Sequence, residues 1–163
     1  MNSVVDGIDP NFLAHQTRIL CLSYLRWTKR PLIEKAPDAA DAWRQLYAAP
    51  FAVVSHDTKP DPVFNYANSR AQQLFGMGWQ EFTRLSSRYS AEPDAREERF
   101  ALLKRVTRYG YVDDYCGIRI AKDGSRFMIR NAVVWNLLNE TGDYCGQAAL
   151  IREWIPLCEM HNL

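Results

Sequence analysis

The chain has 163 residues, of which 47% are hydrophobic, 12% aromatic and 24% charged. This length and composition can build one ordinary domain with a sizeable core, and they exclude a disordered, collagen-like or low-complexity chain. The formal net charge of +1 creates no global field that would attract nucleic acid or an anionic membrane, so neither is expected as a partner.

Two helices are predicted first. Asp9 and Pro10 are typical of a helix start, with Asp at the N-cap and Pro at the first helical position, and Pro31 ends this helix. Its apolar residues cover more than one stripe, which indicates packing on two sides. Asp38 is expected to cap the second helix. Residues 1–49 are therefore predicted to form an N-terminal helical extension.

Short strands and short helices are predicted next. Residues 51–55 are apolar and β-branched, and residues 63–66 form a second short run, so the proline-rich turn between them predicts a hairpin. Asn68 is expected to cap a short helix that ends at Gly76 in a left-handed conformation. Another helical turn is predicted at 79–82.

The remainder of the chain predicts one long helix and three strands. The helix is expected from Asp94 to Tyr109, with Asp94 at the N-cap and cationic residues near the C-terminus. The strands are predicted at 111–121, 126–138 and 144–154, and the Asp-Gly turn after the first of them is a strong hairpin signal.

The order of two strands, a run of helices and three strands with tight turns is typical of an α+β fold with an antiparallel sheet. We expect five antiparallel strands with helices on one face. This domain is predicted to span residues 50–156, and residues 157–163 are predicted to form a C-terminal tail.

Several motifs resemble known families. Residues 61–68 and the following Leu74-Phe75-Gly76 resemble the PAS signature in which a strand ends in Asn and a short helix ends in Phe-Gly, and Lys122-Asp123-Gly124 resembles a PAS hairpin. More narrowly, residues from about 50 to 154 resemble the MEKHLA domain, a PAS-like module. The matching residues are Ser55-His56-Asp57, Pro60-Asp61-Pro62, Phe64-Asn65-Tyr66, Ser90-Ala91-Glu92-Pro93, Arg96-Glu97-Glu98-Arg99, Val134-Trp135-Asn136 and Tyr144-Cys145-Gly146-Gln147-Ala148-Ala149.

This resemblance carries functional implications. MEKHLA domains occur as stand-alone bacterial proteins, the type that this chain resembles, and at the C-terminus of plant class III homeodomain–leucine zipper proteins. PAS domains sense small molecules, light or redox state, or mediate dimers. The resemblance therefore implies a small-molecule sensing or protein-interaction module with a PAS-like fold, and the motifs of the sequence, described below, favour a non-enzymatic one.

Two PAS cofactors are not expected here. In flavin-binding light-oxygen-voltage (LOV) domains a cysteine forms a thiol adduct, whereas Ser87 stands at the matching position, and a hydroxyl is far less nucleophilic than a thiolate. The polar residues that grip the flavin ring are replaced by Arg119, Ile129 and Ala148. Haem-binding PAS domains use a histidine of the long helix, which contains none here. The cofactor stays unknown, and a flavin- or haem-binding sensor is kept as an alternative.

Strand alternation predicts which side chains face the helices. The inward residues of the last strand would be Gly146, Ala148 and Leu150. We predict a cavity for a small polar or anionic ligand, in which Arg119 anchors the anion. The alternative is that Arg119 pairs with Asp113 and side chains fill the cavity. The predicted ligand-binding residues are Tyr115, Arg119, Asn131, Trp135, Ser87 and Asn65.

The opposite face of the sheet is too apolar to be left in water. Alternation places on it Cys116, Ile118, Ile120, Met128, Ala132, Val134, Cys145, Ala149 and Ile151. We expect the N-terminal helix over residues 12–27 to cover this face, from the same chain or from a partner. A homodimer through that helix or through the outer sheet face is therefore predicted.

No catalytic constellation is found in the sequence. Ser86, Ser87 and Ser90 lie near acidic residues, but there is no G-x-S-x-G elbow, no assigned histidine partner and no phosphate-binding glycine loop. No catalytic residue is assigned, and an enzyme of unknown reaction that uses the same cavity is the alternative.

The expected compartment is the cytoplasm. No stretch approaches the ~20 apolar residues that span a bilayer, and the first nine residues carry two Asp and no Lys or Arg, unlike a secretory signal. The four cysteines, Cys21, Cys116, Cys145 and Cys158, show no CxxC spacing. We therefore expect reduced thiols and no metal site.

Overall fold

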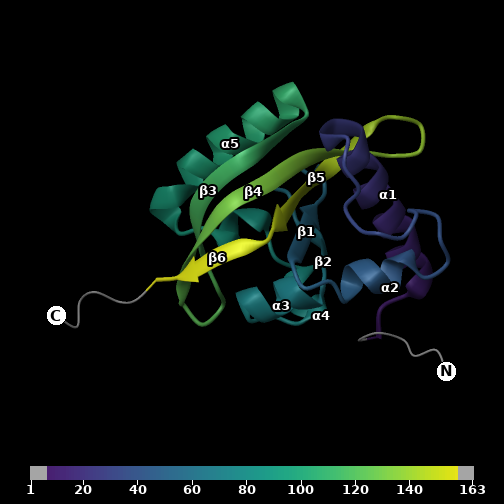
Figure 1. The fold of residues 1–163 in the computed structure, drawn as a ribbon. Coiled ribbons are helices and arrows are strands. Elements are labelled where there is room, and N and C mark those ends of the chain that lie inside the picture. The colour runs from purple at the N-terminus through teal and green to yellow at the C-terminus, as the bar shows by residue number, and fades with distance from the viewer. Residues whose placement is uncertain (1–6, 158–163) are drawn as a thin grey trace.

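A computed structural model of the chain describes residues 7–157 (Figure 1). Its helices are α1 (Pro10–Thr28), α2 (Ala42–Tyr47), α3 (Ser69–Phe75), α4 (Trp79–Phe82) and α5 (Arg96–Tyr109), with 3-10 turns η2 (Ser87–Ser90) and η3 (Pro93–Ala95). Its strands are β1 (Ala52–His56), β2 (Phe64–Ala67), β3 (Tyr111–Ile120), β4 (Arg126–Leu138), β5 (Tyr144–Ile151) and β6 (Glu153–Pro156).

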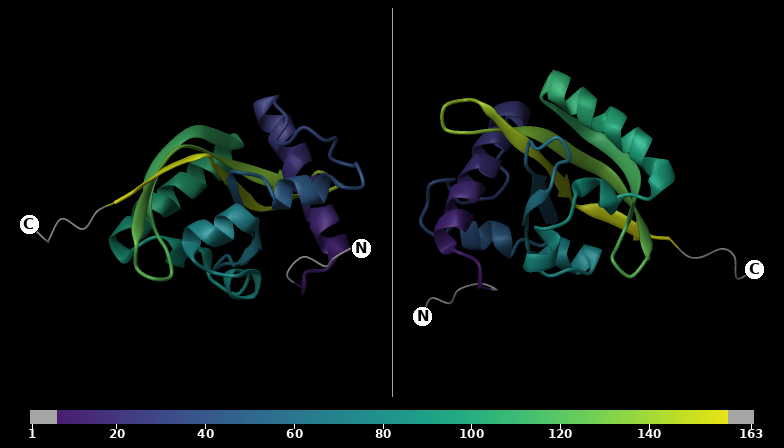
Figure 2. Two further views of the ribbon diagram at one scale, coloured as in Figure 1. Left: turned by 60° about the horizontal axis from the view of Figure 1, so that its bottom comes forward. Right: turned by 180° about the vertical axis from the view of Figure 1, so that it is seen from behind.

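The strands form one antiparallel sheet in the order β2-β1-β5-β4-β3, with the short β6 beside β4. Two hydrophobic clusters fill its two faces, one beneath α3, α4 and α5 and one beneath α1 and α2. Figure 2 shows the same separation of the helices. The predicted α+β class and antiparallel sheet are confirmed.

One bulge in β4 changes which residues face the helices. Ile129 pairs with Gly117 of β3 and Ala132 pairs with Tyr115, so two residues of β4 oppose one of β3. The extra residue is Asn131, which is exposed and has a φ of 51°. Because side chains alternate with a period of two, one extra residue moves every later side chain to the other face.

This bulge overturns part of the predicted alternation. Ala132 and Val134 pack toward α5, together with Ala149 and Ile151 of the paired strand β5. Val133, Trp135, Ala148 and Leu150 pack on the opposite face, beneath α1. The prediction was therefore wrong for the later part of β4 and for β5, and it holds for β3, where Tyr115 and Arg119 face the helices.

The single last strand that the sequence predicts is two strands in the structure. β5 ends at Ile151 and β6 begins at Glu153. The two pair with β4 on either side of Asn131, because Val133 pairs with Leu150 and Arg130 pairs with Glu153. The interruption at Arg152 therefore accommodates the extra residue of β4.

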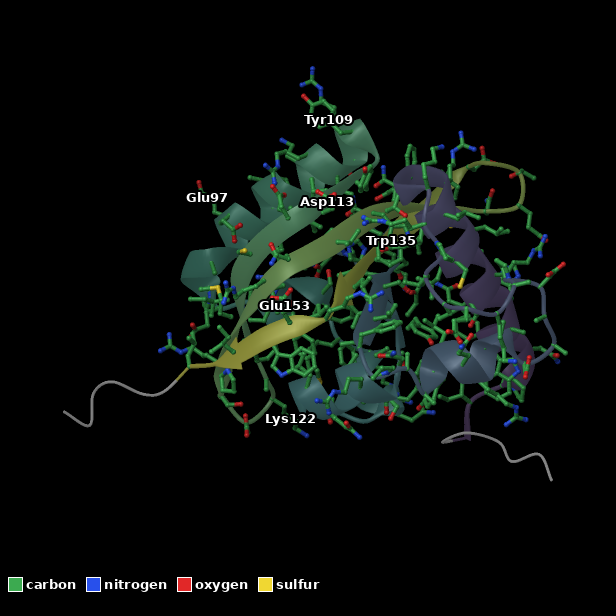
Figure 3. The ribbon with its side chains drawn as sticks, in the orientation of Figure 1. Glu97, Tyr109, Asp113, Lys122, Trp135 and Glu153 are labelled. Atoms are coloured by element: carbon green, nitrogen blue, oxygen red, sulfur yellow. The ribbon has the colours of Figure 1, made fainter. Side chains whose placement is uncertain are left out.

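The N-terminal helix covers part of the outer sheet face, as predicted, mainly over the second half of β4, where Val133, Trp135 and Leu137 lie beneath it. Trp135 packs edge-on against Tyr24 of α1 with ring centroids 5.0 Å apart, and it lies beside that helix in Figure 3. Ser23 and Trp27 of α1 also form hydrogen bonds with the backbone of β4. α1 is thus part of the folded core.

Helix ends agree with the sequence at α1 and α3 and differ elsewhere. Asp9 caps α1 by accepting from the backbone of Asn11, and Asn68 caps α3. α2 begins with Asp41 at its N-cap, later than the predicted Asp38. α5 begins at Arg96 after the 3-10 turn, so Ala95 rather than Asp94 holds the N-cap.

Two further predictions concern the C-terminal tail and the possibility of a membrane-spanning helix. Apart from Leu157, the predicted C-terminal tail lies outside the described residues, as does Cys158. Within residues 7–157, no helix is both long enough and apolar enough to traverse a lipid bilayer.

Candidate functional site

A small cavity lies between the inner face of the sheet and α5. Its volume is about 60 Å³, several times the ~10–15 Å³ that admits one water molecule. Most of its lining is apolar: Val54, Phe64, Phe75, Leu102, Leu103, Ile129, Val134, Ala148, Ala149 and Ile151. The polar lining residues are Ser55, His56, Ser90, Arg99, Tyr115, Arg119 and Gln147.

Arg119 reaches this cavity from β3 and is only 7% exposed. Its guanidinium donates from Nη2 to the hydroxyl of Tyr115 at 2.9 Å and from Nη1 to a backbone oxygen, that of Ile118, at 2.9 Å. Tyr115 donates in turn to Glu98 Oε1 at 3.1 Å. Burial raises the pKa of Tyr115 above its ordinary value, so its hydroxyl keeps the proton that it donates.

Arg99 reaches the cavity from α5 and is 9% exposed. Its Nη2 donates to Ser87 Oγ at 2.8 Å. Arg99 has a position on the helix that an apolar residue would normally hold, because it lies three residues before Leu102 and seven before Val106, which are both buried.

Neither guanidinium forms an ion pair in the described part of the chain. Asp113, the alternative partner predicted for Arg119 from the sequence, is exposed on β3. Burial and, to a smaller extent, the positive charge of Arg119 together lower the pKa of Arg99 to about 10. The cavity therefore holds two buried, like charges that contact no described carboxylate directly, although Tyr115 joins Arg119 to Glu98.

His56 is the third charged or chargeable group at the cavity. It lies at the end of β1, is 6% exposed, and interacts through Nδ1 with the backbone oxygen of Asp57 at 2.9 Å. Its Nε2 is buried and has no hydrogen-bond partner among the described residues. Burial lowers the pKa of His56 to about 4, and the charge of Arg99 also lowers it. The imidazole is therefore neutral at pH 7.

A surface cleft of about 640 Å³ adjoins the cavity. His56, Arg99, Leu103 and Gln147 line both spaces, so they form the boundary between the cavity and the cleft. The cleft runs between α5, η2 and the loop at residues 57–62. A ligand entering from solvent would meet these four side chains.

The cleft carries an excess of positive charge. Its acidic residues Asp57 and Asp61 form ion pairs with Lys59 and Arg88. Arg96 and Lys104, which also line it, form no ion pair with a side chain that the structure describes.

The structure brings together half of the predicted site residues. Tyr115 and Arg119 line the cavity, and Ser87 is fully buried beside the cleft, where it accepts from Arg99. The other three lie elsewhere, for separate reasons. Asn131 is the exposed bulge residue, and Trp135 faces α1 because of that bulge.

Asn65 lies on the outer side of β2. Its Oδ1 accepts from the hydroxyl of Ser55 at 2.6 Å, and Ser55 in turn accepts from Gln16 of α1 at 3.2 Å. These contacts join the hairpin to the N-terminal helix and keep the Asn65 side chain away from the cavity.

Most residues that line the cavity were not in the predicted site, and three of them, Arg99, His56 and Gln147, matter most for its chemistry. Arg99 could have been found from its position in the apolar stripe of the long helix. His56 is on the same face as Ala52 and Val54, which strand alternation predicts. On β5 the side chain of Gln147 faces the cavity, whereas Ala148, which also borders the cavity, packs in the cluster beneath α1; the bulge concealed this from the sequence.

Gln147 serves mainly to hold α5 on the sheet. Its Nε2 has two N–H groups, which are shared among three acceptors, Leu103 O, Thr107 Oγ1 and Asn136 Oδ1, at 3.0–3.1 Å. Asn136 donates in turn to Val106 O of the same helix at 2.9 Å.

Among the side chains that the structure describes, no group of three or more His, Cys, Asp or Glu has the arrangement of a metal site.

Comparison with solved structures places this fold among PAS and LOV domains. The PAS domain of a protein from Colwellia psychrerythraea is 16% identical, with a TM-score of 0.58 over 68% of this chain and 91% of that one. A LOV domain studied with a flavin analogue is 19% identical, with a TM-score of 0.54 over 73% and 86%. The light-state dimer of the fungal photoreceptor Vivid is 16% identical, with a TM-score of 0.56 over 82% and 91%.

No match is found among curated proteins. A model of the MEKHLA domain family matches residues 14–156, which include most of α1 as well as the region after residue 50. The matched segment thus contains the whole sheet, α5 and both residues that carry the buried guanidiniums. The chain belongs to the MEKHLA domain family.

Proposed function

We propose that this chain is a non-enzymatic sensing module that binds a small carboxylate in its internal cavity, between Arg99 and Arg119. The observation that carries the proposal is that these two guanidiniums are 9% and 7% exposed and form no ion pair within the described chain. The signal would be the change in structure or stability that accompanies filling of the cavity.

The energetics of buried charge support an anionic ligand. Removing a cation from water costs several kcal/mol unless a counter-charge and hydrogen bonds compensate. A guanidinium has five N–H donors, whereas Arg99 makes one described hydrogen bond and Arg119 makes two. A carboxylate can accept two parallel bonds from a guanidinium, so it would supply both the charge and the missing acceptors.

The size and lining of the cavity support a short aliphatic ligand. Its volume of about 60 Å³ is well below the ~300 Å³ at which sites for drug-sized ligands begin. This size does not favour a flavin or haem. The residue at the LOV cysteine position, Ser87, is engaged by Arg99, and α5 contains no histidine.

The charge of the cleft supports entry of an anion. Arg96 and Lys104 lie along it without ion pairs to any side chain that the structure describes, and Arg99 stands at its inner end. A concave surface of one charge raises the local concentration of oppositely charged ligands. On entering the cavity, the anion would replace Ser87 Oγ as the acceptor of the hydrogen bond from Arg99.

Binding is favoured over catalysis by the partner of Ser87. A serine nucleophile needs a general base within hydrogen-bond reach. Here the group that contacts Ser87 Oγ is the guanidinium of Arg99, which has donors only and cannot take a proton.

The proposal is tested by differential scanning fluorimetry and calorimetry with formate, acetate and propionate. We expect saturable stabilisation of the wild type that is lost in Arg119→Gln and in Arg99→Gln. Arg130→Gln, which changes an exposed arginine of β4, should bind as the wild type does. Absence of binding by every carboxylate, or equal binding by all three variants, would show the proposal to be wrong.

We also infer that two copies pair through the part of the outer sheet face that α1 leaves uncovered. Ile155 of β6 is 45% exposed there, beside Met128, and the related fold of Vivid forms a light-state dimer. Sedimentation analysis should give a dimer for the wild type and for Phe100→Glu on α5, and a monomer for Ile155→Glu. A monomeric wild type would contradict this.

A further inference from the structure

The Nε2 atom of His56 is a second unused binding group at the cavity. The Nδ1 atom faces the backbone oxygen of Asp57 at 2.9 Å, and a carbonyl oxygen can only accept. Nδ1 therefore carries the proton of the neutral imidazole, which leaves a lone pair on Nε2. That lone pair is buried and has no donor among the described residues.

The surroundings of His56 keep this lone pair available. The imidazole is 6% exposed, and burial together with the charge of Arg99 lowers its pKa to about 4. At pH 7 Nε2 is thus an acceptor. A buried acceptor without a partner is costly, so the position favours a ligand that brings a hydrogen-bond donor.

The protein's own donors at the cavity are engaged elsewhere. The two N–H groups of Gln147 Nε2 are shared among three acceptors on α5 and β4, and Ser90 Oγ donates to Ser87 O at 2.8 Å. His56 and Arg99 line the same cavity and the same cleft. A ligand held by the guanidinium would therefore lie in the same space as the imidazole.

The charges restrict the kind of donor. An ammonium group would donate to Nε2, but it would lie in the same small cavity as two guanidiniums, and like charges repel. A hydroxyl donates without a charge. Its oxygen also has lone pairs that can accept a bond from a guanidinium.

We propose that the ligand of this cavity is a short hydroxycarboxylate, whose carboxylate is held by Arg99 and Arg119 and whose hydroxyl donates to Nε2 of His56. This inference rests on the proposed carboxylate site and adds the class of carboxylate. It assigns to His56 the selection of a hydroxyl over a methyl or an ammonium group.

Three probes of equal heavy-atom count test the class directly. Glycolate, propionate and glycine share one carboxylate and differ only in a hydroxyl, methyl or ammonium group at the far end. Calorimetry with the full chain at pH 7 should give about tenfold tighter binding of glycolate than of propionate, since a buried acceptor is satisfied in one complex only. Glycine should bind more weakly than either.

A variant and a spectroscopic measurement identify the residue responsible. In His56→Phe the preference for glycolate should disappear while propionate still binds. On the wild type, nitrogen-15 NMR of the imidazole should show the Nε2 resonance of His56 change with glycolate and stay in place with propionate, whereas the exposed His15 should respond to neither. The NMR measurement needs no variant to fold.

The failures of the two proposals are distinguishable. Equal affinity for glycolate and propionate would overturn the hydroxycarboxylate class and leave the carboxylate site standing. A glycolate preference that persists in His56→Phe, or an Nε2 resonance that ignores glycolate, would overturn the role of His56. Absence of binding by all three probes would overturn the carboxylate site itself.

Discussion

Trp27, near the end of α1, donates from its indole Nε1 to the backbone oxygen of Asn136 at 2.9 Å. The side chain of Asn136 donates in the other direction, to Val106 O of α5, also at 2.9 Å. One residue of β4 thus holds α1 on one face of the sheet and α5 on the other. Because α5 carries Arg99, any shift of α5 on binding of the proposed ligand would act on the same residue that anchors the N-terminal helix.

Removal of the Asn136 side chain should weaken this junction. In Asn136→Ala, Val106 O and Gln147 Nε2 each lose one hydrogen bond and keep another partner, Gly110 N and Leu103 O respectively. One such hydrogen bond contributes about 0.5–1.5 kcal/mol net, so we expect the free energy of unfolding in urea to fall by about 1–3 kcal/mol. Arg105→Gln, on the exposed side of α5, should change it by less than about 0.5 kcal/mol. A loss no larger than in that control would contradict the role of Asn136.

Gly110, in the turn between α5 and β3, also lies against Trp27 of α1. It has a φ of +97°, and a Cβ built on it would lie 2.7 Å from ring carbons of Trp27. Gly110→Ala should therefore combine backbone strain of about 1–2 kcal/mol with displacement of the indole. Gly124 has a similar φ of +89°, but a Cβ there would meet no other atom. Gly124→Ala therefore measures the cost of backbone strain alone.

The comparison of these two glycine variants has a defined outcome. Chemical denaturation should show a clearly larger loss for Gly110→Ala than for Gly124→Ala, and the near-ultraviolet circular dichroism should change only in the former. Equal losses would mean that Trp27 does not restrain this turn.

The buried imidazole of His56 should make stability depend on pH. Its pKa falls from 6.5 to about 4 in the folded chain because burial disfavours the charged form. The unfolded chain therefore takes up the proton first as pH falls, so the free energy of unfolding decreases from about pH 6.5 and levels off, for this group, below about pH 4. The full loss is about 3 kcal/mol.

Denaturation between pH 7.5 and 4 would measure this dependence. His56→Gln should lack most of the decrease, whereas His15→Gln should retain it, because His15 is exposed. Identical profiles for the wild type and His56→Gln would mean that His56 is not held neutral by the fold.

Replacement of Arg119 should maintain or raise the free energy of unfolding without ligand, and it should remove the stabilisation that a carboxylate ligand gives. Methionine is of similar length and carries no charge, so Arg119→Met relieves the repulsion between two buried cations that contact no described carboxylate directly. We expect unfolding free energy in carboxylate-free buffer to stay equal or to rise by about 1–2 kcal/mol. Addition of acetate should stabilise the wild type and leave the variant unchanged. A strong loss of stability in the variant without ligand would mean that Arg119 is already compensated.

Turn chemistry and hydrophobic pattern predicted most of the fold. The Asp-Pro start of α1, the Asn68 cap and the Asp-Gly hairpin act locally, so neighbouring residues are enough to recognise them. The antiparallel order of the later strands follows from the tight turns between them.

The candidate site was less predictable because it depends on one inserted residue. Asn131 adds a bulge whose position depends on pairing with β3, and no local pattern marks it. On β3 and the first part of β4 the predicted faces were correct, including those of Tyr115 and Arg119, whereas Trp135 beyond the bulge was placed on the wrong face. Arg99 was missed because a charged residue in a helix is normally expected to face solvent.

A crystal structure of the full chain grown with saturating acetate tests the central claim most directly. We predict carboxylate density inside the cavity, with its oxygens within hydrogen-bond distance of the guanidiniums of Arg99 and Arg119. Density for water alone in the cavity, or acetate bound only at Arg96 and Lys104 in the outer cleft, would contradict it.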